Sequence, residues 1–194
     1  MIQRCLAIIL LIGLTACGGT GAPIHYYLID PVSQSPINSP SDLHVQIIDL
    51  QIPQYLERFQ IASRRDGNRL VFADGHQWGE NLRKNLTRTL SINLAELLAT
   101  NYIGTPINRT TGVADYRVQV FIQRFERDPD NVLRLSVRWQ LATAQNEDRG
   151  TYSRDYSSDK AITRHDDTVS NMAQLFSELS LAIATSIQEA ETTR

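Results

Sequence analysis

Two stretches in the second half of the chain alternate apolar and polar residues, the pattern of a half-buried β-strand. Residues 116–123 carry tyrosine, valine, valine and isoleucine at every second position, and residues 133–141 carry leucine, leucine, valine, tryptophan and leucine. Such an alternation places one set of side chains on a core and the other towards solvent. The turn-forming sequence at 128–131 predicts that the two strands form an antiparallel hairpin. A turn at 145–150 then leads to a third strand at 151–156.

The first half of the chain contains shorter strand candidates. One covers residues 24–30 and another covers residues 43–52, and a proline directly follows each of them. Residues 31–41 are rich in proline, serine and asparagine, which is typical of a surface loop. Residues 61–65 and 69–72 flank an Asp-Gly-Asn turn, so we expect a further hairpin there.

Two longer segments repeat apolar residues every three or four positions, which predicts amphipathic helices. The first is expected from Trp78 to Leu98 and the second from about Asp167 to Ala190. The apolar stripe of the first helix consists of Trp78, Leu82, Leu86, Leu90, Leu94, Leu97 and Leu98. Its polar face is expected to consist of Arg83, Lys84, Asn85, Arg88 and Asn93.

Burying each large side chain of that stripe stabilises the fold by about 1.5 to 3 kcal/mol, so the helix requires a sheet on which to pack. Two helices and a mixed sheet of at least five strands then predict one layered domain, either α/β or α+β.

The first residues of the chain have the pattern of a secretory signal. Arg4 precedes an apolar run from Leu6 to Leu14, and Leu14-Thr15-Ala16-Cys17 follows it directly. The run is too short to cross a bilayer, which takes about 20 apolar residues. The tetrapeptide is similar to a bacterial lipobox, so we expect residues 1–16 to be removed and Cys17 to carry a diacylglycerol. An ordinary signal peptide that ends near a cysteine is the alternative.

Cysteine usage supports lipidation. The chain has two cysteines, and Cys5 lies within the segment to be removed, so Cys17 would have no partner for an intramolecular disulfide. We therefore divide the chain into a signal peptide (1–16), a lipidated tether (17–23), one domain (24–190) and a tail (191–194). Within the tether, residues 18–21 form a flexible Gly-rich leash.

Composition and motifs exclude several classes of function. The formal charge is −2, and acidic and basic residues are interspersed, so we expect no nucleic-acid partner. The four histidines are scattered and no pair has the i, i+4 spacing of a helical metal site, so we expect neither a metal nor a cofactor besides the covalent lipid. Residues His165 to Thr168 are expected to cap the last helix. A hydrolase that uses His165 and Asp166 is a remote alternative, because no motif supplies a nucleophile.

Residues 53–59 carry two aromatic residues and an arginine directly after a strand. Tyrosine and arginine are enriched at the anchors of protein interfaces, which makes Tyr55 and Arg58 candidate partner-binding residues. On residue types alone, a packed turn at the end of the strand is the preferred interpretation.

Several motifs resemble one family along most of the chain. His25 to Pro31, just after the lipobox, is similar to the Tyr-Tyr-Leu-Leu-Asp-Pro opening of the ABC-type transport auxiliary lipoproteins of the PqiC (YmbA) kind. Ile52 to Arg58, followed by Gln60-Ile61 and Ser63-Arg64, resembles that family's Ile-Pro-x-Tyr-Leu-Asp-Arg-Pro-Gln-Ile-Val-Thr-Arg signature. Residues 78–82 are similar to its Trp-Ala-Glu-Pro-Leu helix start. Phe59 and Asn81 replace two prolines of the pattern, and Glu57 replaces an aspartate.

The resemblance implies an α/β, three-layer domain with a mixed β-sheet of about five or more strands and two long amphipathic helices. It also implies a non-enzymatic, membrane-anchored subunit of an MCE-type intermembrane lipid transport system that contributes to membrane integrity. Its partners would be an MCE-domain periplasmic tunnel protein and further copies of the chain. Tyr55, Arg58 and Arg64 would contribute to these contacts. Gly18 after Cys17 favours the outer membrane, because an aspartate there resembles an inner-membrane retention signal. The alternative is a periplasmic carrier that holds an acyl chain in its own cavity.

Overall fold

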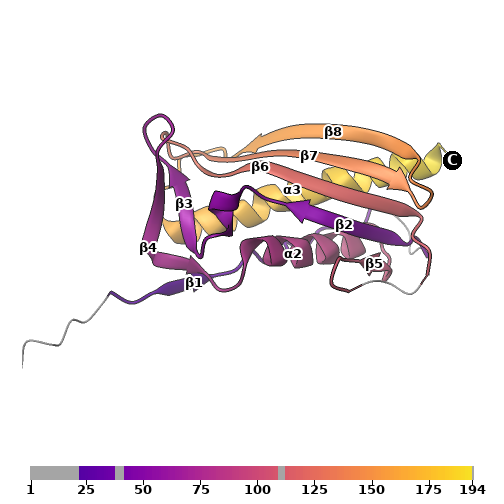
Figure 1. Cartoon of the computed structure of the whole chain (residues 1–194), viewed down its shortest axis with the longest axis horizontal. Coiled ribbons are helices and arrows are strands. Elements are labelled where there is room, and N and C mark those ends of the chain that lie inside the picture. Colours follow the sequence, from indigo (N-terminus) through magenta and orange to yellow (C-terminus); the bar gives the residue numbers. More distant parts are fainter. Residues whose placement is uncertain (1–21, 38–41, 109–111, 194) are drawn as a thin grey trace, which may run out of the picture.

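The computed structural model describes residues 22–37, 42–108 and 112–193 (Figure 1). Cys17 and the predicted leash lie outside the described residues. The elements are β1 (His25–Tyr27), β2 (Val45–Gln51), the 3-10 helix η2 (Gln54–Glu57), β3 (Gln60–Arg64), β4 (Leu70–Trp78), α2 (Leu82–Leu97), β5 (Ile103–Gly104), β6 (Tyr116–Arg127), β7 (Leu133–Thr143), β8 (Asp148–Ser157) and α3 (His165–Thr192).

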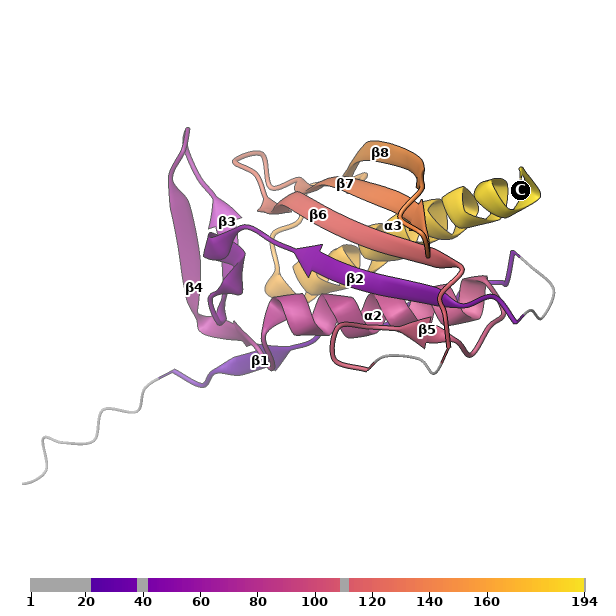
Figure 2. The same cartoon turned by 45° about the vertical axis from the view of Figure 1, so that its right-hand side comes forward.

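All eight strands belong to one mixed sheet that is organised around β6. On one side, β6 pairs with the antiparallel β7, which in turn pairs with β8. On its other side β6 carries two strands in succession: β2 runs parallel to its first half, and β3 joins it at Arg127. Beyond β3 come the antiparallel β4 and then β1, which is parallel to β4. In Figures 1 and 2 the β3–β4 hairpin stands at one end of the sheet, apart from the long strands.

The predicted strands are all present, although β1 is shorter than expected and β4 continues beyond the expected residues 69–72 to Trp78. Val118 lies opposite Leu141 and Val120 lies opposite Trp139, and all four side chains are buried on one face of the sheet. The hairpin expected around residues 66–68 is formed by β3 and β4. The strand expected over residues 24–30 is limited to the three residues of β1.

Both long helices pack on this buried face. The Trp139 indole nitrogen of β7 donates a hydrogen bond to Ser186 Oγ of α3 at 3.2 Å. Asn93 of α2 donates to Ser180 Oγ of α3 at 3.0 Å, and this bond joins the two helices. The prediction of an exposed Asn93 is therefore wrong, and so is that of an exposed Asn85, because Asn85 bonds both backbone groups of Ile29. Each amide has a buried polar partner, which offsets the cost of its burial.

The α/β class and the mixed sheet are confirmed, and the sheet is larger than the minimum of five strands. The described residues form two layers rather than the three expected, because α2 and α3 share one face. The other face carries polar side chains, such as those of Arg117, Gln119, Arg138 and Gln140, at the alternate positions of β6 and β7.

The first helix begins later than predicted. Trp78 is buried as the last residue of β4, and α2 begins at Leu82 after the cap residue Asn81, whose Oδ1 accepts a hydrogen bond from the Lys84 amide. Trp78 matched the apolar stripe only because it lies four residues before Leu82. Among the described residues, no helix has the length and apolar character needed to cross a bilayer.

Candidate functional site

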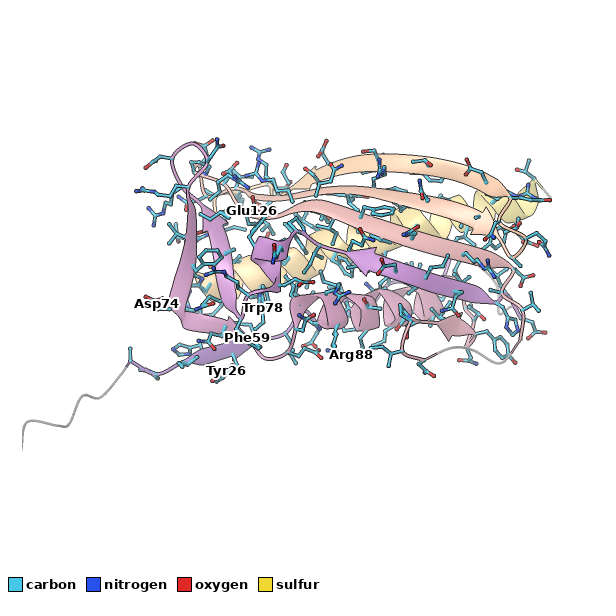
Figure 3. All side chains as sticks on the ribbon, viewed as in Figure 1. Tyr26, Phe59, Asp74, Trp78, Arg88 and Glu126 are labelled. Carbon is cyan, nitrogen blue, oxygen red and sulfur yellow. The ribbon has the colours of Figure 1, made fainter. Side chains whose placement is uncertain are left out.

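A buried carboxylate gathers two of the three predicted partner-binding residues. The 3-10 helix η2 lies between β2 and β3 in the chain. These two strands pair with successive parts of β6, β2 with its first half and β3 at Arg127, so η2 spans the junction between them. Glu126 of β6 lies at this junction, where Figure 3 labels it, and its side chain is fully buried. Tyr55 donates its hydroxyl to Glu126 Oε2 at 2.7 Å, and Arg64 donates Nε to Oε1 at 3.0 Å.

Further donors complete the coordination of this carboxylate. Arg124 Nε donates to Glu126 Oε1 at 3.0 Å, and the Phe125 amide donates to Oε2 at 3.0 Å. We call Tyr55, Arg64, Arg124 and Glu126 the Glu126 cluster. Four donors share one carboxylate, so its charge is compensated where water is excluded.

The pKa shifts reflect this arrangement. Burial, followed by the hydrogen bond to Glu126, raises the pKa of the Tyr55 hydroxyl far above its ordinary value. Burial lowers the pKa of Arg64, but its hydrogen bond and charge interaction with Glu126 outweigh that effect and raise it. Both shifts favour a neutral Tyr55 hydroxyl and a charged Arg64 guanidinium.

Arg58, the third predicted residue, lies at the surface instead. Its guanidinium stacks 4.5 Å from the centre of the Phe72 ring, and the neighbouring Phe59 side chain is 63% exposed. A groove of about 630 Å³ runs beside Arg58 and Phe72 and is lined by Gln54, Tyr55, Glu57, Arg58, Leu70 and Phe72. The structure thus joins Tyr55 and Arg64 through Glu126, with Tyr55 also lining the groove, and leaves the side chains of Arg58 and Phe59 exposed.

A second cluster joins residues that sequence reasoning left apart. His76 of β4 stacks on His25 of β1, with ring centres 5.2 Å apart, and on His165 of α3 at 3.9 Å. The Tyr27 hydroxyl lies 2.8 Å from His76 Nδ1 and donates to Asp166 Oδ1 at 3.0 Å. We call these five residues the histidine cluster. They come from three elements far apart in sequence, so no local spacing could have revealed them.

The histidine cluster has a defined proton arrangement. Since the Tyr27 hydroxyl has one proton and donates it to Asp166, it accepts a hydrogen bond from Nδ1 of His76. Burial lowers the pKa of His165, and the neighbouring His76 and Arg127 lower it further. The hydrogen bond from Arg164, followed by that from Tyr27, lowers the pKa of Asp166.

The expected cap at His165 to Thr168 is only partly correct. α3 does begin there, and Asp166 and Asp167 occupy its first turn, where negative charge is favourable to the helix dipole. The cap residue is Arg164, however, and no side chain caps the helix. The Thr168 hydroxyl instead donates to the Arg164 carbonyl at 2.9 Å. Within the described ranges, no group of three or more His, Cys, Asp or Glu side chains could hold a metal ion.

Comparisons with known proteins agree with this architecture. The model of the family described as ABC-type transport auxiliary lipoprotein component matches residues 26–184. The crystal structure of protein XCC0632 from Xanthomonas campestris is similar, with a TM-score of 0.68 at 12% identity, over 88% of this chain and 99% of that one. The crystal structure of an uncharacterized protein has a TM-score of 0.65 at 20% identity, over 85% of this chain and 99% of that one. No curated protein sequence matches significantly.

Proposed function

Since the chain belongs to the ABC-type transport auxiliary lipoprotein family, we propose that it is an outer-membrane lipoprotein that acts as a docking and assembly subunit of an MCE-type intermembrane lipid transport system. The family match over residues 26–184 is the observation that carries this proposal. The lipobox ending at Cys17 adds the membrane anchor, and Gly18 favours the outer membrane. We further propose that the subunit is not an enzyme and helps to preserve membrane integrity.

The docking surface of this proposal consists of the groove lined by Arg58 and of the exposed side chain of the next residue, Phe59. An exposed aromatic ring and a stacked guanidinium are residue types that carry much of the affinity of protein interfaces. Tyr55 and Arg64 support the surface from behind, because they attach η2 and β3 to Glu126. In this proposal they contribute to partner binding by holding the surface in shape.

Co-purification with the MCE-domain partner tests this surface. Arg58→Glu with Phe59→Ser is expected to lower the yield of the partner severalfold while leaving the circular dichroism spectrum unchanged. Arg88→Glu with Ile92→Ser is the matched control, because both residues are exposed on α2, and Arg88 is labelled away from this end in Figure 3. Equal yields from the two double variants would contradict the proposed surface.

The proposal also includes homo-oligomerisation, which β8 supports. This strand of ten residues pairs with β7 only, so one of its edges is unpaired within the described chain. A long free edge is a template for pairing with another chain. The Ser158 amide donates to the Leu133 carbonyl, so by alternation the Ser153 amide faces away from β7.

Ser153→Pro is expected to shift native mass spectra towards the monomer, whereas Ser153→Ala would retain the oligomer. Identical spectra would exclude this edge.

One observation favours a second function, that of a lipid carrier. A cavity of about 240 Å³ lies between α2 and the segment after β5, with Leu50, Pro106 and Ile107 as apolar walls. Its charged lining consists of Arg83, Lys84 and Asp49, so two cations face one carboxylate. Apolar walls with a charged rim suit an amphiphile, although ligand sites usually measure about 300 to 1,000 Å³. Native mass spectrometry of protein purified without its anchor tests this function. A co-purifying lipid lost in Ile107→Asp would support the carrier, and a lipid-free spectrum would contradict it.

A further inference from the structure

The short strand β1 presents an apolar face to solvent. Ile24, Tyr26 and Leu28 alternate along the chain and are 46%, 65% and 42% exposed. Residues two apart in an extended chain point to the same side, so these three side chains share one face. Figure 3 labels Tyr26 at the lower edge of the molecule. We call these three side chains the β1 face.

The sequence around the β1 face is free of fixed charge. No Asp, Glu, Lys or Arg occurs from Gly18 to Ile29, although such residues make up 21% of the chain. Apolar side chains with a central tyrosine are typical of segments that lie at the boundary between headgroups and acyl chains. A charged residue there would oppose insertion, and this segment has none.

The predicted lipid is close to this face. Seven peptide units separate Cys17 from Ile24, and a chain of that length can span at most about 25 Å. The headgroup layer of a bilayer is about 5 to 8 Å deep on each side, so the leash is long enough for the β1 face to reach it. Such a short tether holds the face near the bilayer at a millimolar effective concentration, so a weak contact suffices.

The opposite side of β1 is attached to the domain. The Tyr27 hydroxyl bonds to Asp166, and the Tyr27 carbonyl accepts a hydrogen bond from the Gly79 amide at 2.8 Å. The Ile29 amide is held by Asn85 at 2.8 Å. β1 is therefore a rigid part of the domain, and any contact that its outer face makes also orients the rest of the molecule.

We propose that the β1 face rests on the surface of the lipid bilayer, with Tyr26 at the level of the headgroups, and thereby fixes the orientation of the domain above the membrane. This inference depends on the proposed lipid anchor at Cys17 and adds a second, non-covalent contact. The docking surface around Arg58 then has a constant orientation relative to the membrane.

Lipid quenching of a single fluorophore tests the proposal. The mature chain has no cysteine other than Cys17, so an acylated protein with Tyr26→Cys offers one reactive thiol. This thiol is labelled with an environment-sensitive dye, and the protein is placed in phosphatidylethanolamine and phosphatidylglycerol vesicles that contain nitroxide-labelled lipid. Leu181→Cys on α3, which is also partly exposed, is the matched control. Quenching is expected to be severalfold greater at residue 26 than at residue 181.

Two double variants test whether the side chains of the β1 face, and not the short tether alone, bring residue 26 to the bilayer. Ile24→Ser with Leu28→Ser is expected to reduce the quenching at residue 26 severalfold, and Ile48→Ser with Ile92→Ser to leave it unchanged. Equal quenching at residues 26 and 181 would overturn the proposal. A dye at residue 26 that is shielded from water but not quenched by lipid would also overturn it, because a protein would then cover the β1 face.

Intact mass separates this inference from the proposed function. Acylated protein with no preferential quenching would remove the membrane contact and leave the lipoprotein intact. Wild-type protein that takes up the dye at Cys17 would show a free thiol, and both proposals would fail.

Discussion

The Glu126 cluster and the histidine cluster both attach the β1–β4–β3 end of the sheet to the rest of the domain, but they do so with different chemistry. The Glu126 cluster is built around a fully buried carboxylate, whose charge is compensated by two arginines that remain partly exposed. The histidine cluster is partly exposed and consists mainly of stacked, titratable rings. The comparison teaches that two attachments of one substructure can differ in strength and in sensitivity to pH, because burial controls both properties.

The largest effect is expected when the acceptor of the buried cluster is removed. Glu126→Ala leaves Arg64 and Arg124 without their carboxylate, and breaking a buried pair in this way costs about 3 kcal/mol. Urea unfolding of the mature chain with Cys17→Ser measures the change. Glu80→Ala removes an exposed ion pair with Arg88 and is expected to cost less than about 1 kcal/mol. Similar losses from the two variants would show that the Glu126 cluster does not stabilise the junction.

A smaller loss is expected from Tyr55→Phe, which removes one hydroxyl and leaves the ring in place. The lost hydrogen bond joins a neutral donor to a buried carboxylate, and such bonds contribute about 1.5 to 3 kcal/mol. Urea unfolding measures this change as well. An unchanged stability would mean that the hydroxyl does not help to compensate Glu126.

The histidine cluster is expected to show the stronger pH dependence near neutrality. The pKa of His165 is lowered in the folded state, so the unfolded chain binds its proton more readily. The stabilising contribution of uncharged His165 is therefore fully present above the unfolded pKa of 6.5. It declines as the pH falls below 6.5, until the pH reaches the lower pKa of the folded state. His76 and Arg127 oppose the charged form, and Asp166 favours it. Urea unfolding at pH 7.5 and at lower pH is expected to show this decline, and His165→Gln should reduce it. A decline unaffected by His165→Gln would contradict the assignment.

The smallest effect is expected from Tyr27→Phe, which repeats the Tyr55→Phe change at the partly exposed cluster. The change removes the 3.0 Å hydrogen bond to Asp166 and the 2.8 Å bond between the hydroxyl and His76 Nδ1. Water reaches this cluster and can replace both partners, so the loss of stability should be smaller than that of Tyr55→Phe. Unfolding of the two variants under the same conditions compares a tyrosine hydroxyl at a buried carboxylate with one at a partly exposed cluster. A larger loss from Tyr27→Phe than from Tyr55→Phe would reverse the ranking of the two attachments.

The sequence alone was sufficient for the elements with a strong repeat. The alternation in β6 and β7 and the stripe from Leu82 to Leu97 are local patterns, and each corresponds to an element of the expected type. The motif at residues 25–31 and the signature after Ile52 also identified the family that the later match to residues 26–184 shows. Local periodicity reports which side chains need a core, and this need is enough to predict helices and strands.

Only the tertiary structure decided which polar residues meet. Asn85 and Asn93 are polar and were therefore expected on the solvated face of the helix. They are buried instead, because they bond to Ile29 and Ser180, which lie far away in sequence. The same holds for Glu126, which no motif singled out, and for the three histidines that stack at the start of α3. Hydrogen bonds and ring contacts act over a few ångströms in space. Partners on separate strands and helices therefore leave no regular spacing in the chain, and the fold has to bring them together before they can be recognised.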